Sequence, residues 1–468
     1  MPANENSSAR FPWERFSLPV LAHRLWLGCA LSWTDFRRLQ GIENPLERDW
    51  ECKRALGFPD ETRTRVAGLL QNVAQASSLP SANPQAGSLR YFPMIFINTR
   101  TVFSDGVRDD LEIVCAEGCI VEIRPAGRAP TAHAIDLAGN FLAPGFVDLH
   151  LHGACGHDAM EATPEAFRAI CDYHARGGTT SLLLTTATAP VADIVEVLHA
   201  VREHRSEFPQ IAGVHLEGPF VSPERAGAQR VEFIRNPDPE SVSQLLEYAD
   251  VIQRITLAPE LPGALEAIAR FRAAGISVSG GHSGAWDEEA RAGFEQGMRH
   301  VTHTFNCMSS ARRRDGKRVA GLLEFALSEP EIVCELIADG YHVSPTLMRM
   351  LYRAKGASGI CLVTDATAGA GLPNESHFDL AGRDCVVSAG ACYLADRSAL
   401  AGSAAQMIDL VGTMVCGVGV PLHEAIAMAS TNPARTLRGE RSGKIEVGAE
   451  ANFVVLSPEF EVIEVRRG

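Results

Sequence analysis

The strongest constraint on the fold is a repeated alternation of short apolar runs and longer stretches of helical periodicity between residues 146 and 364. Counting the run that leads into His150-Leu-His152 as the first strand gives roughly eight strand–helix units in succession. This count predicts an α/β protein built on a (β/α)8 barrel of the TIM type. It disfavours an open doubly wound sheet, because the Gly-X-Gly-X-X-Gly turn of nucleotide-binding sheets is absent from the sequence.

The same pattern places the individual elements of the barrel. The predicted strands are Phe146–Leu151, Thr180–Thr185, Ile211–Leu216, Ile255–Leu257, Ser277–Gly280, His300–Thr302, Val333–Ile337 and Ile360–Thr364. The predicted helices are Pro164–Arg176, Val191–His204, Ser241–Tyr248, Pro262–Ala274, Glu288–Gln296 and Pro345–Ala354.

Short strands with Gly and Asp turns flank the barrel on both sides. We therefore predict a small β-sandwich domain formed by residues 91–143 and 382–468, whose C-terminal helices pack on a barrel of residues 144–381. Residues 1–90 are rich in Arg, Trp, Ser and Pro and end in a stretch of low apolar content. We interpret them as a poorly ordered N-terminal extension, with the natural start of the protein near Met94.

The composition of the chain disfavours several classes of binding partner and a position in a membrane. A formal net charge of −14 argues against nucleic acid or an anionic membrane as the main partner. No apolar run approaches the ~20 residues of a membrane span. The 12 cysteines are scattered without a Cys-X-X-Cys pair, which predicts reduced thiols and a cytoplasmic location.

His150 and His152 lie two residues apart on the first predicted strand. Residues at that spacing point to the same face of a strand, so both imidazoles can reach one metal ion. Taken alone this pair is a weak signal, and two polar residues at a strand end are an equally good interpretation.

Further polar residues follow later strands, at the ends where the active site of such a barrel lies. Each has a structural alternative as a helix cap, a turn residue or a hydrogen-bonded side chain. Together they converge on one mouth of the barrel, and capping gives no reason for so many of them to be histidine. They are Glu217, His282, His303, His342 and Asp365.

A divalent metal explains this set of residues. Glu217, His282 and His303 offer two nitrogens and one oxygen, which suits Zn²⁺ or Fe²⁺ with an open position for water; Mn²⁺ and Co²⁺ are alternatives. The two histidines of the first strand would add a second ion, bridged by Glu217, so that one or two ions are expected.

Two residues remain for proton transfer and carbonyl activation. A metal ion makes hydroxide available at neutral pH, and Asp365 beside it would take the proton and pass it to a leaving group. His342 would polarise a carbonyl or hold the oxyanion. The pattern predicts metal-assisted hydrolysis of an amide, ester or imine.

Several stretches resemble, in order, the N-acetylglucosamine-6-phosphate deacetylase family of the amidohydrolase superfamily, from about Met94 to the C-terminus. The stretches are Pro144–His152, His215–Phe220, Thr256–Glu260, Gly281–Ser283, Thr302–Met308, Ala338–Val343 and Leu362–Ala366. The resemblance implies a metal-dependent hydrolase barrel with a small β-sandwich, a homodimer, and hydrolysis of N-acetyl-D-glucosamine 6-phosphate to D-glucosamine 6-phosphate and acetate.

The resemblance also implies roles for individual residues. Glu217, His282 and His303 match the metal ligands of the family, and Asp365 matches its catalytic acid and base. Some members have Gln and Asn at the first pair and use one metal; both residues are His in this chain, which keeps a two-metal site open. The positions that match substrate contacts are Ala228, Asn306, Cys307, His342, Leu400, Ala401 and Gly402.

The chain departs from the family pattern at two places. Asn306-Cys-Met308 replaces the usual Asn-Ala-Met, and we favour a packing role for Cys307 over a thiol ligand. The phosphate-binding Arg of the family falls in an altered stretch, where Arg314 is the best positional match and Arg312, Arg313 or Arg318 could substitute.

Two alternatives follow from these departures. The substrate could be N-acetylgalactosamine 6-phosphate or another N-acyl compound. From a different class of protein, the chain could be a non-catalytic scaffold barrel, although a scaffold has no need for the metal ligands and Asp365.

Overall fold

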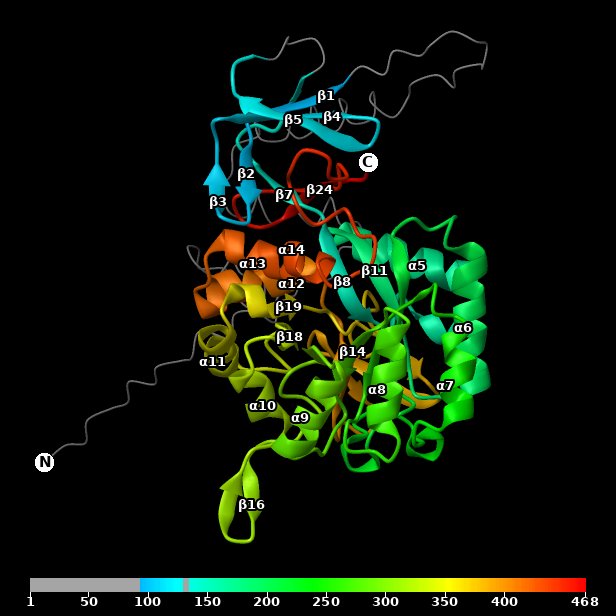
Figure 1. Ribbon diagram of the computed structural model, residues 1–468. Coiled ribbons are helices and arrows are strands. Elements are labelled where there is room, and N and C mark those ends of the chain that lie inside the picture. The colour runs from blue at the N-terminus through cyan, green and yellow to red at the C-terminus, as the bar shows by residue number, and fades with distance from the viewer. Residues whose placement is uncertain (1–92, 129–133) are drawn as a thin grey trace, which may run out of the picture. The chain divides into compact units, whose positions relative to one another are not determined.

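A computed structural model describes residues 93–128 and 134–468 of the chain. The predicted extension of residues 1–90 lies outside the described residues. The central element is a sheet of eight parallel strands, and each strand pairs with the next one along the chain (Figure 1). The strands are β8 (Phe146–Leu151), β11 (Thr179–Thr186), β12 (Ile211–Glu217), β13 (Ile252–Leu257), β14 (Ser277–Gly280), β15 (His300–Val301), β18 (Val333–Leu336) and β19 (Ile360–Leu362).

The first and last strands of this sheet are joined by the segment that follows β19. Leu151 forms a parallel bridge with Ala366. The Asp365 amide donates to the His150 carbonyl at 2.8 Å, and the His152 amide donates to the Ala366 carbonyl at 2.7 Å. These bonds close the sheet into a barrel, which confirms the predicted (β/α)8 architecture.

Helices cover the outside of the barrel (Figure 1). The Thr163 hydroxyl accepts a hydrogen bond from the Ala166 amide and Pro164 occupies the first turn of the first helix, two signals that favour a helix start. The helix buries Phe167 and Ile170 toward the barrel core. The helices are α5 (Pro164–Arg176), α6 (Val191–His204), α7 (Pro239–Leu246), α8 (Ala264–Ala273), α9 (Asp287–Gln296), α10 (Leu322–Ser328) and α11 (Pro345–Lys355).

The arginine-rich stretch after β15 folds as a β-hairpin. Strands β16 (Arg312–Arg314) and β17 (Lys317–Val319) pair antiparallel and project from the barrel (Figure 1). Asp315 and Gly316 connect them with φ of 51° and 80°. An Asp-Gly pair with positive φ at both positions is a strong two-residue hairpin turn.

Two further sheets lie outside the barrel, and the five-stranded one takes strands from both flanks of the barrel. A four-stranded sheet has the order β5-β4-β1-β6, and a five-stranded sheet has the order β25-β24-β7-β2-β3. Phe96 and Ile113 share one buried cluster with Phe453 and Val455, so the two ends of the described chain form one core. The strands are β1 (Met94–Ile97), β2 (Arg100–Phe103), β3 (Gly106–Arg108), β4 (Leu111–Ala116), β5 (Cys119–Pro125), β6 (Ala134–Asp136), β7 (Phe141–Pro144), β24 (Phe453–Leu456) and β25 (Val462–Arg466).

A four-stranded antiparallel sheet follows the barrel and contacts its closing segment. Ser403 at its end forms a parallel bridge with Ala366, and the Ser403 amide donates to the Asp365 carbonyl at 2.8 Å. The predicted boundary after Ala381 lies in the turn between its first two strands, and the division into domains stays a prediction. The strands are β20 (His377–Leu380), β21 (Arg383–Ser388), β22 (Ala391–Leu394) and β23 (Leu400–Ser403).

The remaining regular elements are short. Strands β9 and β10 pair after β8, and a run of helices connects β23 to β24. They are β9 (Gly153–Ala154), β10 (His157–Asp158), α12 (Met407–Gly412), η7 (Thr413–Val418), α13 (Leu422–Ala429) and α14 (Thr431–Ala434).

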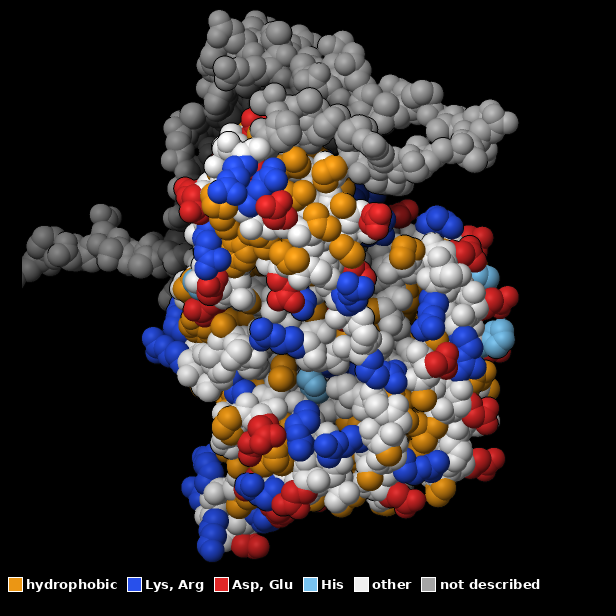
Figure 2. Space-filling view, turned by 45° about the horizontal axis from the view of Figure 1, so that its top comes forward, with side chains coloured by type: hydrophobic (Ala, Val, Ile, Leu, Met, Phe, Trp, Pro, Cys, Tyr) orange, Lys and Arg blue, Asp and Glu red, His pale blue; other side chains and the backbone are white. Residues whose placement is uncertain are grey.

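The surface of the described chain is mixed in character. Figure 2 shows acidic and basic side chains interspersed with hydrophobic ones over one face. Within residues 93–128 and 134–468, no helix has the length and apolar content needed to cross a membrane.

Candidate metal centre

Three side chains from the middle of the barrel sheet form the first candidate group, which we call the central group. Glu217 is the last residue of β12, and His282 and His303 follow β14 and β15. Glu217 Oε1 lies 3.2 Å from His282 Nε2 and 3.0 Å from His303 Nε2, and the two nitrogens are 3.0 Å apart. All three side chains are buried, so their ligand atoms converge in a site shielded from bulk water.

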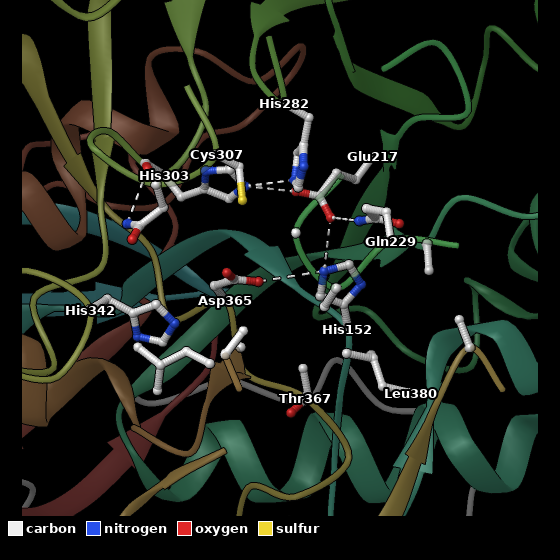
Figure 3. A pocket seen from close by; sticks show the side chains of 18 residues that line it. His152, Glu217, Gln229, His282, His303, Cys307, His342, Asp365, Thr367 and Leu380 are labelled. Atoms are coloured by element: carbon white, nitrogen blue, oxygen red, sulfur yellow. Dashed lines mark hydrogen bonds and ion pairs between the residues drawn. The ribbon is translucent and has the colours of Figure 1, made fainter. Parts of the chain in front are cut away.

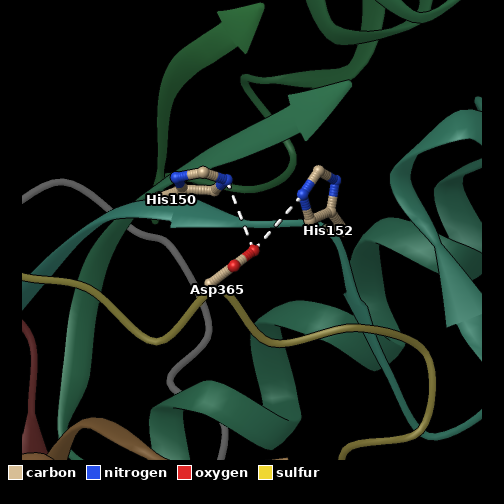
Figure 4. Close-up of side chains that lie close together, drawn as sticks. All are labelled: His150, His152 and Asp365. Carbon is tan, nitrogen blue, oxygen red and sulfur yellow. Dashed lines mark ion pairs between the residues drawn. The ribbon is translucent and has the colours of Figure 1, made fainter. Parts of the chain in front are cut away.

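The second candidate group, which we call the closing group, forms where the barrel closes. His150 and His152 come from the end of β8, and Asp365 comes from the segment after β19 (Figure 4). Asp365 Oδ1 lies 3.4 Å from the Nε2 atom of each histidine. As the spacing of two residues predicted, both imidazoles point to one side of the strand.

Glu217 connects the two groups. Its Oε1 atom lies 3.4 Å from His150 Nε2, and its Oε2 atom lies 3.3 Å from His152 Nε2. In Figure 3 this carboxylate stands between His282 and His152, with Asp365 facing His152. One carboxylate therefore contacts all four imidazoles, as a bridging ligand between two ions would.

The backbone is held in an uncommon conformation where three of these residues leave their strands. His282, His303 and Asp365 have φ of 46°, 30° and 48°. Few residues other than glycine adopt this left-handed region, and such strain persists mainly where the surroundings enforce it. The conformation turns the chain sharply and directs each side chain into the site.

Two of the imidazoles are oriented by a hydrogen-bond acceptor near Nδ1, the ring nitrogen that faces away from the site. His282 Nδ1 lies 2.8 Å from the Arg225 carbonyl, and His150 Nδ1 lies 3.3 Å from Glu335 Oε2. A ring that donates through Nδ1 presents the Nε2 lone pair on its other side, as metal-binding histidines do. His150 Nε2 is buried and has no hydrogen-bond partner in the described part of the chain. The donor set therefore fits a divalent cation in both groups.

The carboxylates are held in the ionised form that metal binding requires. Burial alone would raise the pKa of Glu217, but His150 and His282 hold this pKa well below its ordinary value. Burial also opposes ionisation of Asp365, yet His150 and His152 lower its pKa to about 2. Against burial, Asp365 and Glu217 raise the pKa of His152 to about 9. Opposite charges thus stabilise one another until an ion binds, when each ligating imidazole would give up its proton.

A cavity of about 280 Å³ opens onto both groups (Figure 3). The structure brings most of the predicted site residues together in its wall. His150 is instead buried behind the wall, Ala401 is buried beneath it, and Arg314 lies outside it. The predicted residues that line the cavity are His152, Glu217, Ala228, His282, His303, Asn306, Cys307, His342, Asp365, Leu400 and Gly402.

His342 is fixed at the cavity by Asp339. The carboxylate of Asp339 lies 2.7 Å from His342 Nδ1 and accepts from the His342 amide at 2.9 Å. Burial would lower the pKa of His342, but Asp339 raises it. Because Nδ1 donates to Asp339, the other ring nitrogen is free for a ligand in the cavity.

Arg314 lies on the β16–β17 hairpin, where its side chain interacts with two neighbouring side chains. Its guanidinium pairs with Glu288 at 2.6 Å and stacks over the Trp286 ring at 4.4 Å. No Lys or Arg side chain is among the described residues that line the cavity. Arg383 comes near it by donating to the carbonyls of Gly227 and Ala228 at 3.4 and 3.3 Å.

Sequence reasoning missed several residues that contact the two groups. Gln229 donates to Glu217 Oε2, and its own oxygen accepts from the Thr188 amide. Glu335 contacts His150 from β18. A glutamate inside the apolar run Val333–Ile337 was the available signal, because an acidic residue is rarely buried without a partner.

Comparison with known proteins agrees with this geometry. The sequence profile of the amidohydrolase family matches residues 141–467. The N-acetylglucosamine-6-phosphate deacetylase of Lysinibacillus sphaericus is 32% identical over 370 residues, which cover 78% of this chain and 94% of the relative. The N-acetylgalactosamine-6-phosphate deacetylase of Escherichia coli is 32% identical over 371 residues, which cover 78% and 96%.

A solved structure extends the similarity to three dimensions. The N-acetyl-D-glucosamine-6-phosphate deacetylase of Mycobacterium smegmatis, in complex with N-acetyl-D-glucosamine-6-phosphate, has a TM-score of 0.75 and 30% sequence identity. The match covers 80% of this chain and 98% of that one. Amidohydrolases are metal-dependent, as the two groups of ligands lead one to expect. The chain belongs to the amidohydrolase family and, within it, to the N-acetylglucosamine-6-phosphate deacetylase family.

Proposed function

We propose that the protein hydrolyses N-acetyl-D-glucosamine 6-phosphate to D-glucosamine 6-phosphate and acetate. The observation that carries the proposal is the pair of carboxylate–imidazole groups bridged by Glu217 at one cavity. The central group is the proposed site of the essential ion, with Zn²⁺ or Fe²⁺ ahead of Mn²⁺ and Co²⁺ because the donors are nitrogen and oxygen. When bound, such an ion acts as a Lewis acid and lowers the pKa of water.

Asp365 is the proposed proton carrier of this reaction. Its ionised carboxylate accepts a proton from the attacking water, whose oxygen becomes bonded to the acetyl carbon. The same carboxyl then returns the proton to the amide nitrogen as the C–N bond breaks, so that a free amine and acetate leave. His342, whose pKa Asp339 raises, donates from Nε2 to an oxygen of the substrate when its ring is protonated.

We also propose that the protein is a homodimer and that Arg314 recognises the phosphate of the substrate. The cavity of one chain has no Lys or Arg in its described wall, so a guanidinium must come from elsewhere. A second copy of the chain is one source, because the hairpin that carries Arg314 projects from the barrel (Figure 1). If so, Arg314→Ala raises KM for the phosphorylated sugar and leaves KM for the unphosphorylated sugar unchanged. Arg383→Ala is the matched control, and a larger rise in this variant would move the role to Arg383.

A cytoplasmic location is proposed as well. All ten cysteines of the described residues are free thiols, which supports a reducing compartment.

Acetate release from four substrates tests the proposed reaction. The purified, metal-loaded protein is given the 6-phosphates of N-acetylglucosamine and N-acetylgalactosamine and both unphosphorylated sugars. We expect the highest kcat/KM for N-acetylglucosamine 6-phosphate. A preference for the galactosamine compound would select the second candidate, which the similarity to the Escherichia coli enzyme supports. Equal rates with and without phosphate would remove the phosphosugar assignment, and no hydrolysis of any N-acyl sugar would favour a scaffold.

A further inference from the structure

A fully buried ion pair lies inside the barrel, in contact with the closing group. Arg254 on β13 and Glu335 on β18 form this pair, and both side chains are 0% exposed. Removing two charges from water has a desolvation penalty that their attraction rarely exceeds by much, so a buried pair is weak evidence for a role in stability. A role other than stability must therefore be inferred from the residues that the pair contacts.

Glu335 is anchored on one side and contacts the metal centre on the other. Its Oε1 atom pairs with Arg254, while its Oε2 atom lies 3.3 Å from His150 Nδ1 and accepts from the His303 amide at 3.4 Å. Arg254 is itself held by Thr436 at 3.1 Å and His300 at 3.4 Å. The carboxylate consequently has one orientation, with an oxygen directed at the His150 ring.

This contact determines which nitrogen His150 offers to the site. With Nδ1–H donating to Glu335, the Nε2 lone pair faces Glu217 Oε1 and Asp365 Oδ1, each 3.4 Å away. A carboxylate behind a ligating histidine fixes its tautomer and orientation and strengthens it as a ligand. In the central group, the corresponding acceptor behind His282 is only a neutral backbone carbonyl.

We propose that Glu335, anchored by Arg254, is the positioning residue that makes the closing group able to bind the second metal ion. This inference rests on the metal binding that the proposed function assigns to the two groups, and not on the hydrolysis itself. It assigns the pair a purpose that packing alone does not supply, since two apolar residues would fill the same space without a desolvation penalty.

Metal stoichiometry tests the proposal without relying on activity. The key variant is the double substitution Arg254→Met with Glu335→Leu, which removes both charges at once and leaves no unpaired buried ion. Equilibrium dialysis against buffered Zn²⁺ should show two ions for the native chain and a second ion that binds about 10- to 100-fold more weakly in the variant. Binding of the first ion should change much less, because Glu335 contacts the backbone amide of His303 and not its ring.

A matched variant separates positioning from packing. Arg254→Met with Glu335→Gln keeps a carbonyl oxygen that can accept from His150 Nδ1, so we expect it to restore part of the affinity for the second ion. Adding His150→Gln to the leucine variant should weaken the second ion less than the same substitution does in the native chain, because both changes act on the same ligand. Thermal unfolding with excess Zn²⁺ verifies that each variant is folded.

Several outcomes would overturn the proposal. They are native affinity for both ions in the folded leucine variant, equal weakening of both ions, or a native chain that binds a single ion. If the leucine variant does not fold, Glu335→Asp retains the charge pair but shortens the reach to His150, and unchanged affinity for the second ion would then contradict the proposal. A native chain that binds two ions but releases no acetate would refute the proposed function and leave this inference standing.

Discussion

The central and closing groups differ in how the fold brings them together. Glu217, His282 and His303 follow β12, β14 and β15, which lie within one continuous run of paired strands. The closing group joins the first strand of the sheet to the segment after the last one, so it exists only once the barrel has closed. Strands β12 and β15 are separated by two other strands, so the central group depends on the curvature of the sheet, whereas a second ion would depend on closure and, as proposed, on the buried pair behind His150. The difference suggests one essential ion site and one conditional site.

The largest effect is expected from the residue that both groups share. Glu217→Gln keeps the shape of the side chain but removes the charge that contacts all four imidazoles. We expect neither ion to bind and kcat/KM to fall by about 10⁴-fold or more, because metal catalysis supplies several kcal/mol. Metal analysis and acetate release measure both consequences. Retention of one ion at native affinity would show that Glu217 is not a bridge.

Asp365 tests whether the closing group also performs chemistry. Asp365→Asn retains the size of the side chain but cannot accept a proton. We expect kcat to fall about 10²- to 10⁴-fold, the usual contribution of a general acid–base residue, while the central ion stays bound. Steady-state kinetics with metal analysis provide the check. Unchanged turnover would exclude Asp365 as the proton carrier.

The barrel and most residues of the two groups could be predicted from the sequence, because strands, helices and the polar residues that follow strands are read from local patterns. The strand that contains His150 and ends just before His152 lies where periodicity placed it, and the helix Pro164–Arg176 lies where its capping signals placed it. The ligands followed from polar residues at the ends of apolar runs. These signals are local, and parallel topology brings the same end of every strand to one mouth.

What could not be predicted depends on contacts between distant strands. Arg254 and Glu335 are 81 positions apart, and no local pattern indicates that they pair inside the barrel. The hairpin of Arg314 had a signal in Asp315-Gly316, but the charge run was the more obvious feature of that stretch. Which arginine would reach a phosphate in the proposed dimer depends on how the hairpin is placed relative to another chain, and sequence pattern carries no such information.

The two groups can be compared directly by removing histidines from one at a time. His150→Gln with His152→Asn should abolish only the second ion and lower kcat/KM by no more than about 100-fold, roughly 3 kcal/mol of transition-state stabilisation. His282→Asn should abolish the first ion and reduce activity far more. Zinc titration followed by activity assays tests whether the central group matters more for activity than the closing group. Complete loss of activity and of all metal in the first variant would make the closing group the essential site.

The smallest effect is expected at Cys307, whose thiol lies beside His282 of the central group. Cys307 lines the cavity, and a side chain at Gly227 would place its Cβ only 2.5 Å from the sulfur, so Cys307 is packed tightly against that backbone. If the thiol only fills space, Cys307→Ala should change kcat/KM by less than about threefold, under roughly 0.7 kcal/mol. Cysteine and alanine both carry a Cβ atom at the local φ of 47°, so the exchange removes the sulfur without relieving or adding strain in the backbone. The Co²⁺-substituted protein provides the second measurement, because a thiolate ligand adds a sulfur-to-metal absorption band that the alanine variant would lose. Loss of such a band, together with weaker binding of the first ion, would give the central group a fourth donor and widen the difference between the two groups.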